Sequence, residues 1–229
     1  MKKDLSEVHR IERLTQQYFN NGDLRKGLKT YRTLLEAFPR DRSYYVNYIN
    51  FLLDESVIAE LLWPAYQEAV ACCDRAISQV SEEDKEYFYV KKAELYLIMI
   101  DGDPAWFREH EMEVSSFFEL GLEKYTDSTG LLKCAVAFYR VTSNTSKYEE
   151  VLDKSLLYSP NDIMFVLQKV HLLEKQTNID AAISIIEDWI KNNPNSSYLK
   201  AAYPKIINLY KTNENAEMAD TYQDLLDNL

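Results

Sequence analysis

The chain has 229 residues, 46% of them hydrophobic, and a formal net charge of −11 at pH 7. Binding to nucleic acids and to anionic membrane surfaces depends on Lys and Arg side chains that neutralise phosphates, so this charge argues against both kinds of partner. The chain is long enough to bury a core, and its 5 glycines and 6 prolines leave room for long helices with few interruptions.

Residues 8–41 predict the first pair of helices. Apolar side chains recur at helical spacing in Ile11-x2-Leu14-x3-Tyr18 and again in Gly27-x3-Tyr31-x2-Leu34, and Pro39 follows. Residues three and four apart lie on one face of a helix, so each stretch predicts an amphipathic helix. Asn21-Gly22-Asp23 predicts the turn between the two helices, with Asp23 as the N-cap of the second.

The next two segments, 42–85 and 86–128, predict the same arrangement with extra residues. Their second-helix patterns are Ala69-x3-Cys73 and Val114-x3-Phe118, and Asp103-Pro104 predicts an N-cap followed by the first helical residue. Three regular repeats of roughly 34 residues each would be too short to reach from Pro39 to Pro160. The sequence predicts that the extra residues lengthen the helices of both segments.

The last three segments, 129–162, 163–196 and 197–229, return to a regular period. Pro160 and Pro194, which end two of them, are separated by a period of about 34 residues, which is typical of a helix–turn–helix unit that stacks on copies of itself. The final segment predicts a helix over 215–229 with one apolar and one acidic side, which suits the exposed end of an array.

This pattern resembles the tetratricopeptide repeat (TPR) family, whose repeats carry W-x2-L-G-x2-Y in the first helix, A-x3-F in the second and a proline near the end. Segment 129–162 matches with Leu132-x2-Ala135-Val136-x2-Tyr139 and Pro160. The resemblance implies an all-α fold, an α-solenoid of about six helix–turn–helix repeats and about twelve helices. It also implies a right-handed superhelix and one continuous array over residues 1–229.

Motifs for catalysis, metals or cofactors are absent from the sequence. It contains no glycine-rich phosphate loop and no H-E-x-x-H. Glu109-His110-Glu111 predicts no metal site, because adjacent residues on a helix point about 100° apart. The sequence therefore predicts a protein that is not an enzyme and needs no cofactor.

The resemblance implies a concave groove lined by residues of the first helix of each repeat. Amide side chains there can hold a peptide backbone, and cations can hold a carboxylate. The groove is therefore predicted to favour an acidic or C-terminal peptide segment. The candidate residues are Gln16, Asn47, Asn50, Lys91, Lys133, Arg140, His171 and Lys205.

Two tryptophans in the lengthened middle segments, Trp63 and Trp106, form a second candidate site. Exposed aromatic side chains commonly anchor protein partners. The alternative interpretation is that the two tryptophans pack together in a local core.

These observations predict a non-enzymatic scaffold or adaptor that binds a protein or peptide. Two alternatives are a peptide-sensing regulatory domain and a neutralising partner, of the immunity or inhibitor type, for one specific protein. The N-terminal residues lack the apolar core of a signal peptide, and Cys72, Cys73 and Cys134 form no C-x-x-C motif. We therefore expect the protein in the cytoplasm.

Overall fold

The computed structural model describes residues 5–229, apart from the side chains of Leu5 and Glu60. Over this range it contains thirteen α-helices and no strand, so the predicted all-α fold is confirmed. None of these helices has both the length and the apolar character needed to cross a membrane. In chain order the helices are α1 (Leu5–Asn20), α2 (Leu24–Ala37), α3 (Arg42–Leu52), α4 (Glu55–Leu61), α5 (Trp63–Gln79), α6 (Glu82–Gly102), α7 (Pro104–Lys124), α8 (Thr129–Val141), α9 (Thr145–Tyr158), α10 (Ile163–Lys175), α11 (Ile179–Asn192), α12 (Leu199–Thr212) and α13 (Ala216–Asp227).

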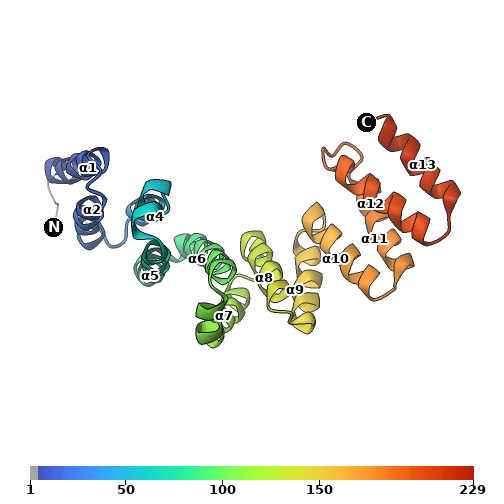
Figure 1. The fold of residues 1–229 in the computed structure, drawn as a ribbon, viewed down its shortest axis with the longest axis horizontal. Helices are drawn as coiled ribbons and strands as arrows, with labels where there is room; N and C mark the ends of the chain where they lie inside the picture. The colour runs from blue at the N-terminus through green and yellow to red at the C-terminus, as the bar shows by residue number, and fades with distance from the viewer. Residues whose placement is uncertain (1–4) are drawn as a thin grey trace. The chain divides into compact units, whose positions relative to one another are not determined.

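The chain divides into two compact units, and most of their helices are labelled in Figure 1. Unit 1 ends at Tyr125 and contains α1 to α7, and unit 2, Thr126–Leu229, contains α8 to α13. In unit 1 the sequence pairs the helices α1 with α2, α3 with α5, and α6 with α7, and α5 also packs extensively on α6. In unit 2 the pairs are α8 with α9, α10 with α11, and α12 with α13. Neighbouring pairs within a unit also pack on each other, for example α5 on α6 and α11 on α12.

Local sequence signals explain where several helices begin. The Asp103 carboxylate accepts hydrogen bonds from the backbone N–H groups of Ala105 and Trp106, both at 3.0 Å, which confirms the predicted N-cap of α7. Asp23 occupies the N-cap position of α2 but makes no capping hydrogen bond. Its carboxylate instead accepts a hydrogen bond of 3.0 Å from Lys26 Nζ, which takes the side chain away from the backbone.

The extra residues of the second segment form a separate helix instead of the expected longer one. This separate helix is α4, which brings the number of helices in the described residues to thirteen, compared with the expected twelve or so. Asp54 caps it by accepting a hydrogen bond of 3.0 Å from the Ser56 N–H. Leu62 then interrupts the chain with φ 53° and ψ −132°, a conformation that costs an L-residue free energy. Pro64 follows in the first turn of α5, where its missing N–H disturbs no helical hydrogen bond. In the third segment the extra residues do lengthen α6 and α7, each of which has 21 residues.

Apolar side chains at helical spacing build a separate core in each unit. One cluster of buried residues lies within unit 1, between Val8 and Leu95, and another lies within unit 2, between Ile163 and Ala219. Small residues of the second-helix pattern, such as Ala69 and Ala182, are completely buried, which allows the paired helices to approach closely.

Two buried lysines form ion pairs at the edge of these cores. Lys92 of α6 places Nζ 2.6 Å from Asp74 Oδ1 on α5, and also 5.1 and 5.0 Å from the ring centroids of Tyr96 and Phe117. In unit 2, Lys169 of α10 places Nζ 2.5 Å from Asp153 Oδ1 on α9. Each pair connects two packed helices, and the aromatic rings add a favourable cation–π contact for Lys92.

Tyrosine hydroxyls connect different helices by donating hydrogen bonds to glutamates. These hydroxyls are partly buried, and burial together with the nearby carboxylates raises the pKa of each phenol above its ordinary value. The pairs are Tyr48–Glu68 at 3.1 Å, Tyr96–Glu113 at 2.9 Å, Tyr210–Glu187 at 2.5 Å and Tyr222–Glu187 at 3.0 Å.

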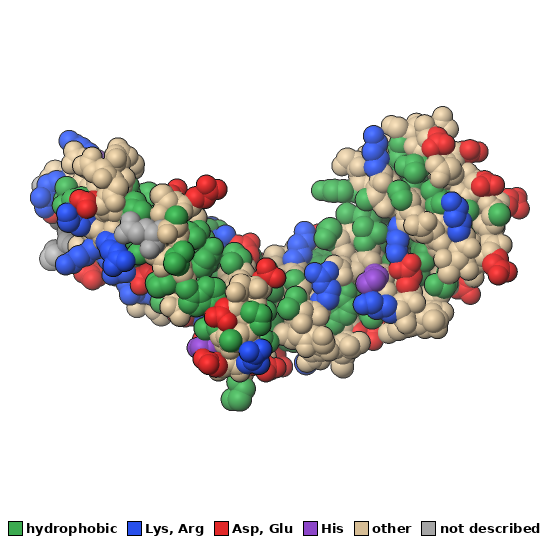
Figure 2. All heavy atoms as spheres, viewed as in Figure 1, with side chains coloured by type: hydrophobic (Ala, Val, Ile, Leu, Met, Phe, Trp, Pro, Cys, Tyr) green, Lys and Arg blue, Asp and Glu red, His purple; other side chains and the backbone are tan. Residues whose placement is uncertain are grey.

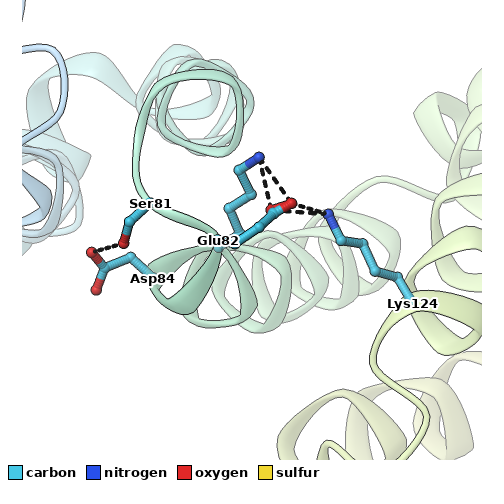
Figure 3. A network of polar contacts seen from close by, with 5 residues as sticks. Ser81, Glu82, Asp84 and Lys124 are labelled. Carbon is cyan, nitrogen blue, oxygen red and sulfur yellow. Dashed lines mark hydrogen bonds and ion pairs between the residues drawn. The ribbon is translucent and has the colours of Figure 1, made fainter.

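An exposed polar network joins the beginning of α6 to the end of α7 (Figure 3). Glu82 accepts hydrogen bonds from Lys85 Nζ at 3.2 Å and from Lys124 Nζ at 3.0 Å, and these bonds lower the pKa of its carboxyl group. Ser81 Oγ donates to Asp84 Oδ2 at 2.8 Å. Exposed ion pairs contribute little stability, so we assign this network only a small part of the free energy that holds the two helix ends together.

Candidate binding site

Three of the four predicted groove cations are already paired within the protein. Lys91 Nζ lies 2.6 Å from Glu94 in unit 1. In unit 2, Lys133 Nζ lies 2.6 Å from Asp162 Oδ2, and Lys205 Nζ lies 2.5 Å from Glu174 Oε2. These carboxylates compensate part of the positive charge that the sequence alone assigns to the groove.

The fourth cation, Arg140, lines a pocket within unit 2 that we call the unit 2 pocket. It has a volume of about 180 Å³ and lies between residues of α8, α9 and α10. Figure 2 shows Lys and Arg side chains and a histidine close together on the visible face of this unit. The residues that line the pocket are Tyr139, Arg140, Ser143, Thr145, Tyr148, His171, Leu172 and Lys175.

Helix ends bring the polar groups of the unit 2 pocket together. Arg140 lies in the last turn of α8, and Ser143 follows in the turn with φ 56°. Asn144 caps α9, so Thr145 is its first residue. His171 and Lys175 lie four residues apart near the end of α10, and this spacing places them on one helix face.

The unit 2 pocket is electropositive. None of the residues that line it is acidic, and the described residues provide no ion pair for Arg140 or Lys175. Burial raises the pKa of the Tyr148 hydroxyl, and the charge of Arg140 opposes that rise, so the guanidinium acts on the phenol electrostatically. The Tyr148 hydroxyl donates a hydrogen bond of 2.8 Å to Gln168 Oε1.

One carboxylate lies beside the pocket without lining it. Glu174 Oε2 is 3.8 Å from His171 Nδ1 and 2.5 Å from Lys205 Nζ. Lys205 therefore takes up much of the charge of Glu174. His171, a predicted site residue, contacts this carboxylate and also lines the pocket.

The three predicted amide residues lie in unit 1, and the described contacts do not bring them into one site. Gln16 is exposed on α1, and its Nε2 donates a hydrogen bond of 3.0 Å to Asn20 Oδ1. Asn47 and Asn50 are exposed on α3. Their role in holding a peptide backbone stays a prediction.

The two predicted tryptophans pack on each other inside unit 1. Trp63 and Trp106 are half-buried, with ring centroids 6.1 Å apart in an edge-to-face arrangement. Tyr66 lies 6.1 Å from Trp63, and the His110 ring stacks on Trp106 at 4.7 Å. This arrangement matches the alternative interpretation of a local aromatic core.

Sequence reasoning missed four polar residues of the unit 2 pocket: Lys175, Ser143, Thr145 and Tyr148. Lys175 could have been found, because it follows His171 by one helical turn. Ser143 and Thr145 belong to a stretch that predicts only a turn, and a turn pattern does not reveal which helix ends it faces. Finding these residues required the packing of α8, α9 and α10.

Comparison with known proteins supports the fold. No protein-family model and no curated protein sequence matches this chain. Solved structures do match. One is YrrB, described as a TPR protein with an unusual peptide-binding site, with a TM-score of 0.53, 17% identity, and coverage of 85% of this chain and 89% of YrrB. Another is BtubC (BKLC) from P. vanneervenii, with a TM-score of 0.59, 14% identity, and coverage of 95% and 90%. The fold is therefore that of TPR-like helical-repeat proteins.

Proposed function

We propose that this chain is a non-enzymatic scaffold or adaptor that binds a partner protein, and that unit 2 holds an acidic or C-terminal segment of that partner. One observation carries the proposal: Arg140, His171 and Lys175 line one pocket without an acidic residue, in a chain whose net charge is −11. Arg and Lys side chains that converge in this way suit a carboxylate, because charge-assisted hydrogen bonds are among the strongest that proteins form.

The size of the unit 2 pocket supports one small group of a peptide over a drug-sized molecule. Its volume of about 180 Å³ is smaller than the roughly 300–1,000 Å³ typical of pockets for drug-sized ligands. It can take one acidic side chain or a chain terminus, while the rest of the segment lies on the exposed faces of the first helices. Because helices carry the site, little free energy is lost in ordering it upon binding.

A binding experiment with charge reversals tests this proposal. The probe is a fluorescein-labelled peptide of alternating Glu and Ser residues, and the readout is fluorescence anisotropy. We expect Arg140→Glu combined with Lys175→Glu to weaken binding at least tenfold.

The matched control reverses Lys191 and Lys211, which lie in the last turns of α11 and α12 outside the pocket. It makes the same change in net charge and should alter binding less than twofold. Equal weakening by both double variants would reject the pocket as the binding site, because net charge alone would then explain the effect.

The acidic surface also suits the alternative of a neutralising partner for a basic protein. Capture of partners from cells, compared between the original chain and the pocket variant, separates the two. A neutralising role predicts one basic protein in stoichiometric amount, whose capture survives the pocket variant. We propose a cytoplasmic location, which the free and buried state of Cys72, Cys73 and Cys134 supports.

A further inference from the structure

The unit 2 pocket contains more positive charge than one carboxylate neutralises. The Arg140 guanidinium and the Lys175 ammonium are each without an ion pair among the described residues, and both line the pocket. A carboxylate supplies one negative charge, whereas a phosphoryl group on a side chain supplies about 1.5 to 2 at pH 7. The charge balance therefore favours a doubly charged oxyanion.

The hydrogen-bond donors of the pocket also suit a tetrahedral oxyanion. Arg140 can donate from the end of α8, the Ser143 and Thr145 hydroxyls from the α8–α9 turn and the start of α9, and Lys175 from the end of α10. A phosphoryl group has three terminal oxygens that accept strong hydrogen bonds, so it can use donors on three sides at once. A flat carboxylate can use fewer of them.

The apolar part of the pocket is rigid. Tyr139 and Leu172 are buried, with 3% and 5% of their surface exposed, and they contribute to the pocket wall. The polar groups of the pocket therefore stand on a packed surface, which lowers the ordering cost of binding a small group.

The helix dipole explains only part of this arrangement. Arg140 and Lys175 lie in the last turns of α8 and α10, where a cation is favourable in any helix. Lys191 and Lys211 also lie in last turns, but neither lines this pocket. The dipole thus accounts for a cation at each helix end but not for two such cations that face one pocket together with two hydroxyls.

We propose that the unit 2 pocket binds the phosphoryl group of a phosphorylated side chain in a partner peptide. This inference rests on the proposed function, since it names the chemical class of the segment that unit 2 holds. One carboxylate beside the pocket, Glu174, is engaged by Lys205, lies 3.8 Å from His171 and does not line the pocket.

Three peptides that differ at one position test the proposal by isothermal titration calorimetry. Their central residue is serine, glutamate or phosphoserine in an otherwise identical acidic sequence, and the ionic strength is held constant. We expect the phosphoserine peptide to bind at least tenfold more tightly than either of the others. Arg140→Gln combined with Lys175→Gln should abolish this preference, and Lys191→Gln combined with Lys211→Gln should leave it intact.

The two proposals fail in different ways. If all three peptides bind equally and the pocket variant weakens all of them, the phosphoryl proposal is overturned and the acidic-segment proposal stands. If the phosphoserine peptide keeps its preference in the pocket variant, this pocket is not the phosphoryl site. If the pocket variant leaves the binding of every peptide unchanged, both proposals are overturned.

Inorganic phosphate and acetate separate the sources of the anion. In ¹⁵N-edited NMR spectra, phosphate should shift the backbone amides of Ser143, Thr145 and Lys175, and acetate at equal ionic strength should not. Equal responses to the two anions would overturn the preference for a phosphoryl group. The phosphoserine peptide should bind at least tenfold more tightly than inorganic phosphate, and equal affinity would overturn the assignment to a peptide.

Discussion

Leu62, the residue between α4 and α5, allows a test of backbone strain, because glycine should stabilise the protein more than alanine at this position. Its φ of 53° and ψ of −132° place it where glycine has no steric penalty. We expect the Leu62→Gly variant of unit 1 to be more stable than the Leu62→Ala variant. At an ordinary exposed helical position, such as Ala71 in α5, glycine should instead cost about 1 kcal/mol relative to alanine.

The magnitude follows from the backbone and the exposure of the side chain. A residue held in such a conformation loses about 1–3 kcal/mol, and glycine costs about 0.5–1 kcal/mol more than alanine in lost backbone freedom. The middle values of these two ranges, about 2 and about 0.75 kcal/mol, leave the glycine variant more stable than the alanine variant by about 1.2 kcal/mol. Leu62 is 64% exposed, so both variants lose a similar small burial contribution of about 0.7 kcal/mol.

Urea unfolding followed by tryptophan fluorescence measures this difference. Trp63 and Trp106 lie in unit 1, and Trp189 lies in unit 2. A Trp189→Phe background, shared by every variant, restricts the signal to unit 1. With an m-value of about 2 kcal/mol/M, the midpoints of the two Leu62 variants should differ by roughly 0.3–1 M. An alanine variant as stable as the glycine variant, or more stable, would refute the assigned backbone strain.

Three further predictions concern the interior of unit 1. Lys92→Met should change the free energy of unfolding by less than about 1 kcal/mol, because methionine keeps an apolar side chain at this buried position and the half-exposed Asp74 stays in contact with water. Asp74→Ala should cost about 1–2 kcal/mol, since it leaves the Lys92 ammonium buried while Asp74 itself is half exposed. A lower urea midpoint for Lys92→Met than for Asp74→Ala would contradict this assignment of the buried charge. A double-mutant cycle of Trp63→Ala and Trp106→Ala should give a coupling of about 0.5–1.5 kcal/mol, and a value near zero would contradict their packing. Burial raises the pKa of the Cys72 thiol to about 12, so iodoacetamide at pH 8 should label this thiol only after the protein unfolds. Mass spectrometry measures the labelling, and rapid labelling of the native protein would show that the Cys72 thiol is accessible.

The regular part of the fold could be predicted from the sequence because its signals are local. Helix α9 ends at Tyr158 and α11 ends at Asn192, each shortly before a proline of the regular period. The spacing of apolar residues predicted which face of each helix packs. These features depend on helical geometry and on proline chemistry, which act over a few residues.

The break between α4 and α5 was missed although a signal for it existed. Pro64 marks the first turn of a new helix, and Asp54 followed by Ser56 marks an N-cap. The extra residues of this segment were instead predicted to lengthen its helices, because its second-helix pattern, Ala69-x3-Cys73, comes later than a regular repeat would place it. Leu62 adopts a conformation that its residue type disfavours, and no local pattern predicts such a residue.

The candidate site depended on contacts that the sequence does not encode locally. The pair of Lys91 with Glu94 follows from their spacing on one helix. Lys133 on α8 pairs with Asp162, the N-cap of α10, and Lys205 on α12 pairs with Glu174 on α10, so the partners in both pairs lie far apart in the chain. The sequence predicted Arg140 together with three other cations. Only the structure shows that Arg140 differs from them, because it lines a pocket and has no ion pair among the described residues.

The tyrosine hydroxyls that connect different helices give this protein an alkaline limit. Burial and the carboxylates of Glu68, Glu113 and Glu187 raise the pKa of the phenols they bind, so the folded state holds their protons more tightly than the unfolded state. The stability linked to these groups is fully present below pH about 10, the ordinary pKa of tyrosine, and is lost as the pH rises further. In strong base each phenolate would face a carboxylate across a helix interface, and the residues that join the helices would then drive them apart.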